Sequence, residues 1–179
     1  MNKNYLAEIK KIQEFRLAIM GKDPYPNNAN GIPFSKDRWS DFEDYRCSGK
    51  YIIDSLGIRI ENAKKKFKSP NDLFLFLLKK HQIVFLNISY TFLGDGAAIS
   101  KKKHSVEINA SLVINKPILI KSDSILLCGQ AKKLRLFYKD ELPSREVFHP
   151  DFRNISKSKW KDDWDTDKLK KTEKLKITI

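Results

Sequence analysis

Short, uninterrupted apolar runs constrain the fold of this chain more than any other feature of its sequence. Three of them are FRLAIM (15–20), IVFLNI (83–88) and SILLCG (124–129), and each is bounded by a turn signal or a polar residue. A fourth run, REVFHP (145–150), ends in a histidine followed by proline. Continuous apolar strands are typical of parallel sheets that are covered on both faces. We therefore predict four buried strands.

Segments with helical spacing of apolar residues alternate with these runs. They cover 4–14, 48–57, 71–81 and 131–142, whereas the apolar stretch 110–120 is expected to be broken at Pro117. Alternation of strands and helices predicts an α/β fold with a central, four-stranded, mostly parallel sheet and helices on both faces. In such folds the ligand site lies beyond the carboxyl ends of the strands.

The length of 179 residues fits one domain, 1–179, in which 157–179 forms a basic C-terminal segment of unassigned structure. Cys47 and Cys128 lie far apart and match no zinc or iron–sulfur spacing, so we expect no metal, no cofactor and two idle thiols in a reducing compartment. The N-terminus lacks a signal sequence and the apolar stretches are too short for a bilayer. We therefore expect a cytoplasmic, intracellular protein that is not secreted and has no membrane partner.

The formal net charge of +13 and a pI near 9.6 favour a polyanionic partner. Lysines and arginines cluster at 64–68, 101–103 and 132–135 and recur between Lys157 and Lys176, where acidic residues interleave. An anionic membrane is the weaker alternative, because no basic stretch accompanies a clean apolar helical face. Charge alone leaves a merely solvated basic surface as an equal alternative to nucleic-acid binding.

Polar or glycine residues follow each predicted strand. Gly21-Lys22-Asp23, Asn87, Gly129-Gln130 and His149 come directly after the four runs or end them. Because parallel strands end at one edge of the sheet, an acid, an amide, a glycine turn and a histidine are expected to converge there. Taken alone, each of these residues is as compatible with an ordinary turn or core position as with a functional role.

The segment GKDPYPNNANGIPFS (21–35) resembles the water-activating motif of family 1 uracil-DNA glycosylases, GQDPYH followed by a loop and G-L-x-F-S. FLNISYTF, SILLCGQAKK and VFHP resemble later motifs of that family in the same order, so the resemblance runs from about residue 15 to about residue 154. The short loop after Asp23, together with Pro26, resembles the poxvirus branch. The resemblance implies a uracil-DNA glycosylase-like fold and activity.

The resemblance also implies roles for individual residues. Asp23 would activate the attacking water, and His149 would donate a hydrogen bond to uracil O2 as the base leaves. Asn87 would read the edge of the uracil, Phe34 would stack on the extruded base, and Tyr25 would exclude the thymine methyl group. These residue types suit the chemistry, because a carboxylate stabilises an electron-poor sugar and a hydrogen-bond donor stabilises an electron-rich base without a metal.

Lys22 occupies the position of the family's glutamine. It is expected to line the substrate pocket largely through its backbone, and its ammonium is expected to lower the pKa of Asp23. Asp151 replaces a serine of the family's DNA-gripping loop, and Arg153, with Phe152 beside it, stands at the position of the residue that wedges into the base stack. The expected DNA-binding residues are Ser48, Gln130, Lys132, Phe152, Arg153 and His104. For His104, the alternative to a phosphate contact is a solvated histidine on the surface.

Three functional hypotheses follow. The first is a DNA repair enzyme, a monofunctional uracil-DNA glycosylase that acts as a monomer on uracil in single- or double-stranded DNA. The second is a catalytically weakened module of the same fold that binds DNA or a replication partner, and a proteinaceous inhibitor is a further unidentified partner. The third is an RNA-binding or other basic protein with a chance motif. Intact Asp23, Asn87 and His149 favour the first, and the altered DNA-gripping loop favours the second.

Overall fold

The computed structural model describes residues 1–25, 31–95, 98–138, 142, 144–150, 153–154, 163–164 and 177–179. Its centre is a four-stranded sheet with the strand order β2-β1-β3-β4. The strands are β1 (Leu17–Gly21), β2 (Ile83–Asn87), β3 (Ile125–Cys128) and β4 (Ser144–Val147). All pairings between them are parallel, which confirms the predicted α/β fold and its four strands.

The apolar runs become strands because both faces of the sheet are covered. Every residue of β1, β2 and β3 is buried, whereas β4, at the edge, is buried only at Val147. The register places Gly21 beside Asn87 and Cys128 beside Val147. The residues that follow the four strands therefore emerge along one edge of the sheet.

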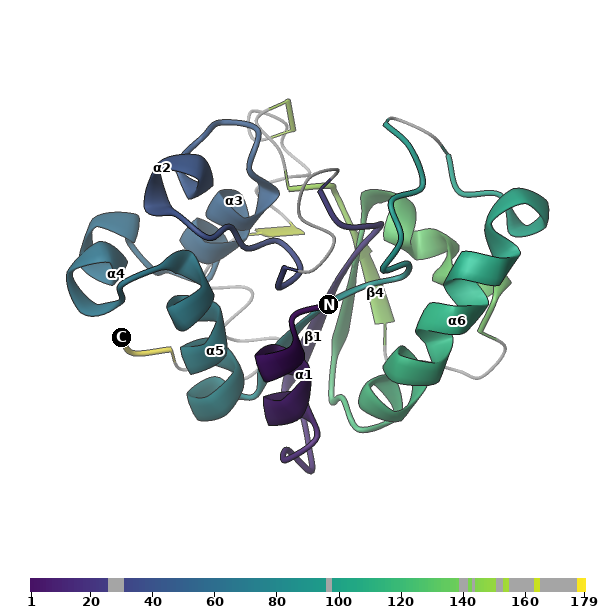
Figure 1. Ribbon diagram of the computed structural model, residues 1–179, viewed down its shortest axis with the longest axis horizontal. Helices are drawn as coiled ribbons and strands as arrows, with labels where there is room; N and C mark the ends of the chain where they lie inside the picture. The colour runs from purple at the N-terminus through teal and green to yellow at the C-terminus, as the bar shows by residue number, and fades with distance from the viewer. Residues whose placement is uncertain are drawn as a thin grey trace.

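Helices lie on both sides of this sheet (Figure 1). They are α1 (Lys3–Ile9), α2 (Trp39–Phe42), α3 (Ser48–Ser55), α4 (Ile60–Lys66), α5 (Pro70–His81), α6 (Lys101–Ile120) and the 3-10 helix η1 (Gly129–Leu136). The first five lie on one side and α6 on the other, as predicted (Figure 1). Of the helices in the described ranges, none has the length and apolar character needed to cross a bilayer.

Two helix predictions are wrong in detail. Helix α6 does not break at Pro117 but continues to Ile120, because a proline in the last turn removes only one backbone donor, the one that faces the Val113 carbonyl. The segment after β3 is a 3-10 helix that starts at Gly129 and ends at Leu136, not an α-helix over 131–142. Residues 139–141 of that prediction lie outside the described residues.

The core connects helix α5 to the edge of the sheet where the strands end. Ser69 and Asp72 form a capping box that starts α5, and Gln82, with φ of 52°, ends it. Helix α5 packs Phe74 against Phe85 of β2, with ring centroids 4.4 Å apart. Phe85 in turn contacts Phe34 edge to face at 6.3 Å. An aromatic chain thus links the helix layer to a residue of the predicted site.

Candidate active site

Gly21, at the end of β1, lies against the side chains of two predicted site residues, Asn87 and Phe34. A Cβ atom at this position would lie 2.7 Å from Oδ1 of Asn87 and 2.7 Å from Cζ of Phe34. Asn87 is brought there by its pairing with Gly21 across β1 and β2. Because glycine has no side chain, the carboxamide and the aromatic ring can approach the same stretch of backbone. The structure thus brings Asn87 and Phe34 together. The strand-end argument covered Asn87, whereas the family resemblance alone had implied a place for Phe34 in the site.

Phe34 is held in a conformation that few residues of its kind adopt. Its φ of 67° lies in the left-handed region, which costs a bulky residue about 1–3 kcal/mol. Gly49 of α3 lies directly against it, because a Cβ at Gly49 would overlap the Phe34 carbonyl oxygen. Sequence reasoning missed Gly49, although a glycine in the first turn of a helix is a signal for close backbone approach. The fold therefore fixes the backbone that carries the Phe34 ring.

Asn87 is almost fully buried, with 3% of its surface exposed. Its backbone carbonyl accepts a hydrogen bond from Nδ2 of Asn115 at 2.8 Å. The described residues provide no hydrogen bond to its side-chain carboxamide. Neither atom of the carboxamide is among the buried polar atoms left without a partner, so the amide keeps access to solvent and is suited to a ligand that supplies both a donor and an acceptor.

Asp23 is held by the segment that follows β2. Its Oδ2 accepts a hydrogen bond from the Leu93 N–H at 2.7 Å, and Nζ of Lys22 lies 3.6 Å from the same oxygen. Burial raises the pKa of Asp23 above its usual value, although the Leu93 N–H and Lys22 both lower it; Asp95 raises it slightly further. Lys22 lowers the pKa of Asp23, as expected, but burial outweighs this effect, so the net shift is upward.

Backbone groups of this segment could not be predicted from the sequence. Leu93 donates its N–H to Asp23, and Gly94 accepts a hydrogen bond from Nζ of Lys22 at 2.6 Å. A main-chain N–H or carbonyl carries no residue-specific pattern, so nothing in the sequence marked either residue as part of the site.

His149 is positioned by three separate parts of the chain. Its Nε2 lies 3.2 Å from Oγ of Ser48, the first residue of α3. Gly129, with φ of 54°, lies so close that a Cβ there would be 2.9 Å from Cβ of His149. Asn154 Nδ2 donates a hydrogen bond to the His149 carbonyl at 2.9 Å. The imidazole thus lies at the start of α3, next to the glycine on which Phe34 rests.

Tyr25 also contacts the start of α3. Its hydroxyl accepts a hydrogen bond from the Ser48 N–H at 3.0 Å and lies 3.6 Å from Sγ of Cys47. Nζ of Lys36 lies 3.6 Å above its ring. Burial raises the pKa of Tyr25 well above its usual value, so the hydroxyl stays neutral at physiological pH. Tyr25 is therefore held by contacts with both its hydroxyl and its ring.

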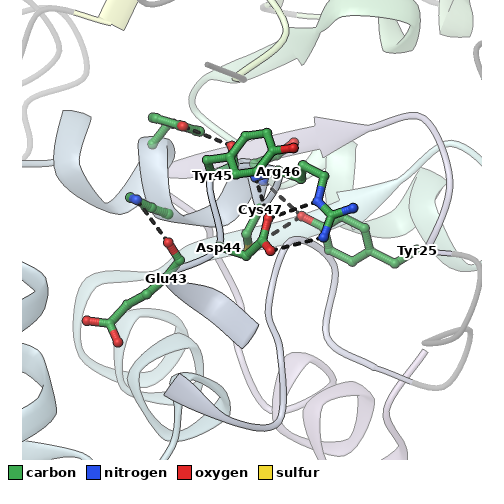
Figure 2. Close-up of polar contacts among 9 residues, drawn as sticks. Tyr25, Glu43, Asp44, Tyr45, Arg46 and Cys47 are labelled. Carbon is green, nitrogen blue, oxygen red and sulfur yellow. Dashed lines mark hydrogen bonds and ion pairs between the residues drawn. The ribbon is translucent and has the colours of Figure 1, made fainter. Parts of the chain in front are cut away.

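The loop that precedes α3 is braced by its own polar contacts (Figure 2). Arg46 forms an ion pair with Asp44 at 3.1 Å, and the Tyr45 carbonyl accepts a hydrogen bond from the Tyr51 hydroxyl at 2.9 Å. These contacts lie in the loop that leads to Cys47, whose Sγ is 3.6 Å from the Tyr25 hydroxyl. Cys47 and Cys128 are buried free thiols, as expected, and burial raises the pKa of both.

The expected DNA-binding residues are placed in different ways. Gln130, Lys132 and Arg153 are exposed. Ser48 is 5% exposed, and its hydroxyl and N–H face His149 and Tyr25 instead of solvent. Phe152, like Pro26 and Asp151, lies outside the described residues.

His104 differs from its expected role. It is 5% exposed, and its Nδ1 accepts a hydrogen bond from the Ser100 N–H at 3.1 Å. The alternative of a solvated histidine is therefore wrong, and the buried ring gives a contact with phosphate no geometric support. Its imidazole instead stabilises the start of α6, which sequence reasoning could not distinguish from a surface role because three lysines precede it.

The described residues contain no cluster of three His, Cys, Asp or Glu side chains that could hold a metal ion. What the edge of the sheet does provide is a carboxylate, a buried amide, an aromatic ring and an imidazole. Such a set can stack a planar ring, hydrogen-bond its edge and stabilise charge that develops on either side of a breaking bond.

The fold is that of uracil-DNA glycosylases. The chain resembles the crystal structure of wild-type UNG from Nitratifractor salsuginis with a TM-score of 0.56 and 15% sequence identity, over 97% of this chain and 79% of that one. A point mutant of the same protein matches with a TM-score of 0.55 and 15% identity, over 94% and 78% of the respective chains. No protein-family model matches the sequence. No curated protein sequence matches it either.

Proposed function

We propose that this protein is a monofunctional uracil-DNA glycosylase of the family 1 type, which hydrolyses the N-glycosidic bond of deoxyuridine in DNA. The observation that carries the proposal is the meeting of the Asn87 carboxamide and the Phe34 ring over Gly21. A pyrimidine that has left the base stack needs an aromatic surface against its face and a donor–acceptor pair against its edge. Asn87 offers both a donor and an acceptor, which match O4 and N3–H of uracil, whereas cytosine presents the opposite pattern.

The proposed reaction is a hydrolysis in which water is the only other reactant. The oxygen of a water molecule bonds to C1′ of the sugar while the bond between C1′ and N1 of uracil breaks, and its electron pair leaves with the base. Asp23 orients this water and offsets positive charge on the sugar. His149 donates a hydrogen bond to O2 of the departing uracil anion, which later takes up the proton released by the water.

Specificity against thymine is assigned to Tyr25. Its hydroxyl is fixed by the Ser48 N–H, and its ring has a lysine on one face, so it has little freedom to yield to an added methyl group. A rigid wall discriminates sterically, whereas a mobile one would adapt.

We further propose that the substrate is single- or double-stranded DNA inside the cell and that the protein acts as a monomer. The net charge of +13 supports a polyanionic substrate, since phosphate contacts dominate affinity for DNA. The short loop after Asp23 supports a relationship to the poxvirus branch of the family. Exposed Gln130, Lys132 and Arg153 are the candidates for contacts with the phosphate backbone.

A second function has one specific observation in its favour. Ser48, the hydroxyl expected to contact phosphate, is buried against His149. The loss of this phosphate contact would weaken the hold on DNA during catalysis. It therefore favours a catalytically weakened module that binds DNA or a replication partner.

Release of uracil from an oligonucleotide with one deoxyuridine, measured with EDTA present, separates the two functions. We expect cleavage by the wild type, and loss of cleavage with DNA binding retained in Asp23→Asn and His149→Leu. Binding without cleavage by the wild type favours the second function, and equal cleavage by all three proteins contradicts the assigned roles.

A further inference from the structure

Lys22 connects the end of β1 to the segment that follows β2. Its backbone carbonyl accepts a hydrogen bond from the Ser89 N–H at 3.0 Å. Its ammonium donates a hydrogen bond to the Gly94 carbonyl at 2.6 Å. One residue thus holds both ends of the segment Ser89–Gly94.

The same segment supplies the N–H group that holds Asp23. Leu93 donates to Oδ2 of Asp23 at 2.7 Å, and the Lys22 ammonium lies 3.6 Å from that oxygen. Oδ1 of Asp23 makes no hydrogen bond with the described residues. One carboxylate oxygen is therefore fixed, while the other remains available to a water molecule.

The Lys22 ammonium is poorly suited to contact substrate directly. Its side chain is 15% exposed, and its short hydrogen bond is directed at Gly94. A charge at this depth interacts with a neighbouring carboxylate more strongly than a surface charge, because it is less screened by water and salt.

We propose that Lys22 is a positioning residue: its ammonium clamps the Leu93–Gly94 backbone against Asp23, so that one carboxylate oxygen is fixed and the other is presented to water. This inference rests on the proposed glycosylase function. It adds a role for the side chain to the expectation that Lys22 lines the substrate pocket largely through its backbone.

Among the described residues, the charged and polar groups that act on Asp23 are Lys22 from its own loop, and the Leu93 N–H and Asp95 from the segment after β2. Lys22 and Leu93 favour the ionised carboxylate, whereas Asp95 and burial oppose it. Removal of the lysine charge therefore leaves the opposing contributions in place, and the pKa of Asp23 should rise.

The test uses two variants that separate charge from hydrogen bonding. Lys22→Gln keeps a donor for Gly94 but removes the charge, and Lys22→Met removes both. Lys121→Gln is the matched control, because Lys121 is exposed and lies beside Phe15 near the opposite end of the sheet. Three quantities are measured in full-length protein: hydrogen exchange at the Leu93 amide, the pKa of Asp23 by carboxyl NMR, and kcat and KM for uracil release across pH.

We expect faster exchange at Leu93 in Lys22→Met, by about tenfold or more, and exchange close to wild type in Lys22→Gln. Both variants should raise the pKa of Asp23 and move the acidic limb of the kcat profile to higher pH. The kcat of Lys22→Met should fall about tenfold or more with KM nearly unchanged. The control should match wild type throughout.

An unchanged Leu93 exchange rate in Lys22→Met, or a raised KM with normal kcat, would overturn the inference. An Asp23 pKa that both variants leave unchanged would overturn it too. Exchange and NMR do not depend on turnover, so an inactive wild type would contradict the proposed function while leaving the clamp testable.

Discussion

Oγ of Ser48 lies 3.2 Å from Nε2 of His149, which joins the first residue of α3 to the chain that follows β4. The N–H group of the same serine donates to the Tyr25 hydroxyl at 3.0 Å. The next residue, Gly49, packs directly against the backbone carbonyl of Phe34. The start of α3 therefore fixes three of the proposed site residues relative to one another.

Substitution of Ser48 tests this arrangement. Ser48→Ala removes the hydrogen bond to His149 but keeps the N–H that holds Tyr25, so kcat/KM for uracil release should fall about tenfold, the value of one hydrogen bond. Discrimination against thymine should persist. Ser40→Ala, an exposed serine in α2, serves as the control. Activity equal to wild type would show that the contact does not position the imidazole.

Two glycine substitutions separate damage to the site from damage to the fold. Gly21→Ala places a methyl group against Asn87 and Phe34, so uracil release should fall at least about 100-fold while stability drops by about 1–3 kcal/mol. Gly49→Ala meets the main chain of Phe34, which cannot move aside as a side chain can, so it should cost more than about 3 kcal/mol. Urea denaturation and the release assay measure the two effects. Comparable losses of stability in both variants would contradict this distinction.

Stability against pH tests the environment of Asp23. Its folded-state pKa is raised above 3.8, so the native state binds the proton more tightly, and the free energy of unfolding falls as pH rises from 3.8 through the folded pKa. Above that window the ionised carboxylate is destabilising. Asp23→Asn removes the charge and can still accept the Leu93 N–H, so its Tm should exceed that of wild type at neutral pH.

The same variant should lose about 10³-fold or more in uracil release. Below the unfolded pKa the difference in Tm should disappear, because both proteins are then neutral at this position. A variant that is less stable than wild type at neutral pH would mean that favourable contacts of the carboxylate outweigh its burial.

Tyr25 variants test the proposed exclusion of thymine. Tyr25→Ala opens the wall and should gain measurable thymine release, with slower uracil release because the ring no longer supports the base. Tyr25→Phe keeps the ring but loses the acceptor for the Ser48 N–H, so it should continue to reject thymine with a modest loss of kcat. Oligonucleotides with a single uracil or thymine measure both activities. Thymine release by Tyr25→Phe alone would transfer the role from the ring to the hydroxyl.

The sheet and the gathering of the strand ends could be predicted, because continuous apolar runs require a buried sheet and parallel strands end at a common edge. Asn87 and Asp23 follow from that geometry. The interior position of His104 could not be predicted, since a buried histidine and a surface histidine after three lysines look alike in sequence. The contacts of Leu93 and Gly94 are made by main-chain groups, which carry no sequence signal. The expected break at Pro117 was wrong because a proline interrupts a helix less when it lies in the last turn, and the sequence does not show where the helix ends.

The measurement that bears most directly on the central claim is a crystal structure of the protein with uracil bound. We predict that the pyrimidine ring stacks on Phe34, that its N3–H and O4 meet the Asn87 carboxamide, and that its O2 faces His149. Uracil bound elsewhere, or a space between Phe34 and Asn87 too small to admit it in crystals soaked at saturating concentration, would contradict the account.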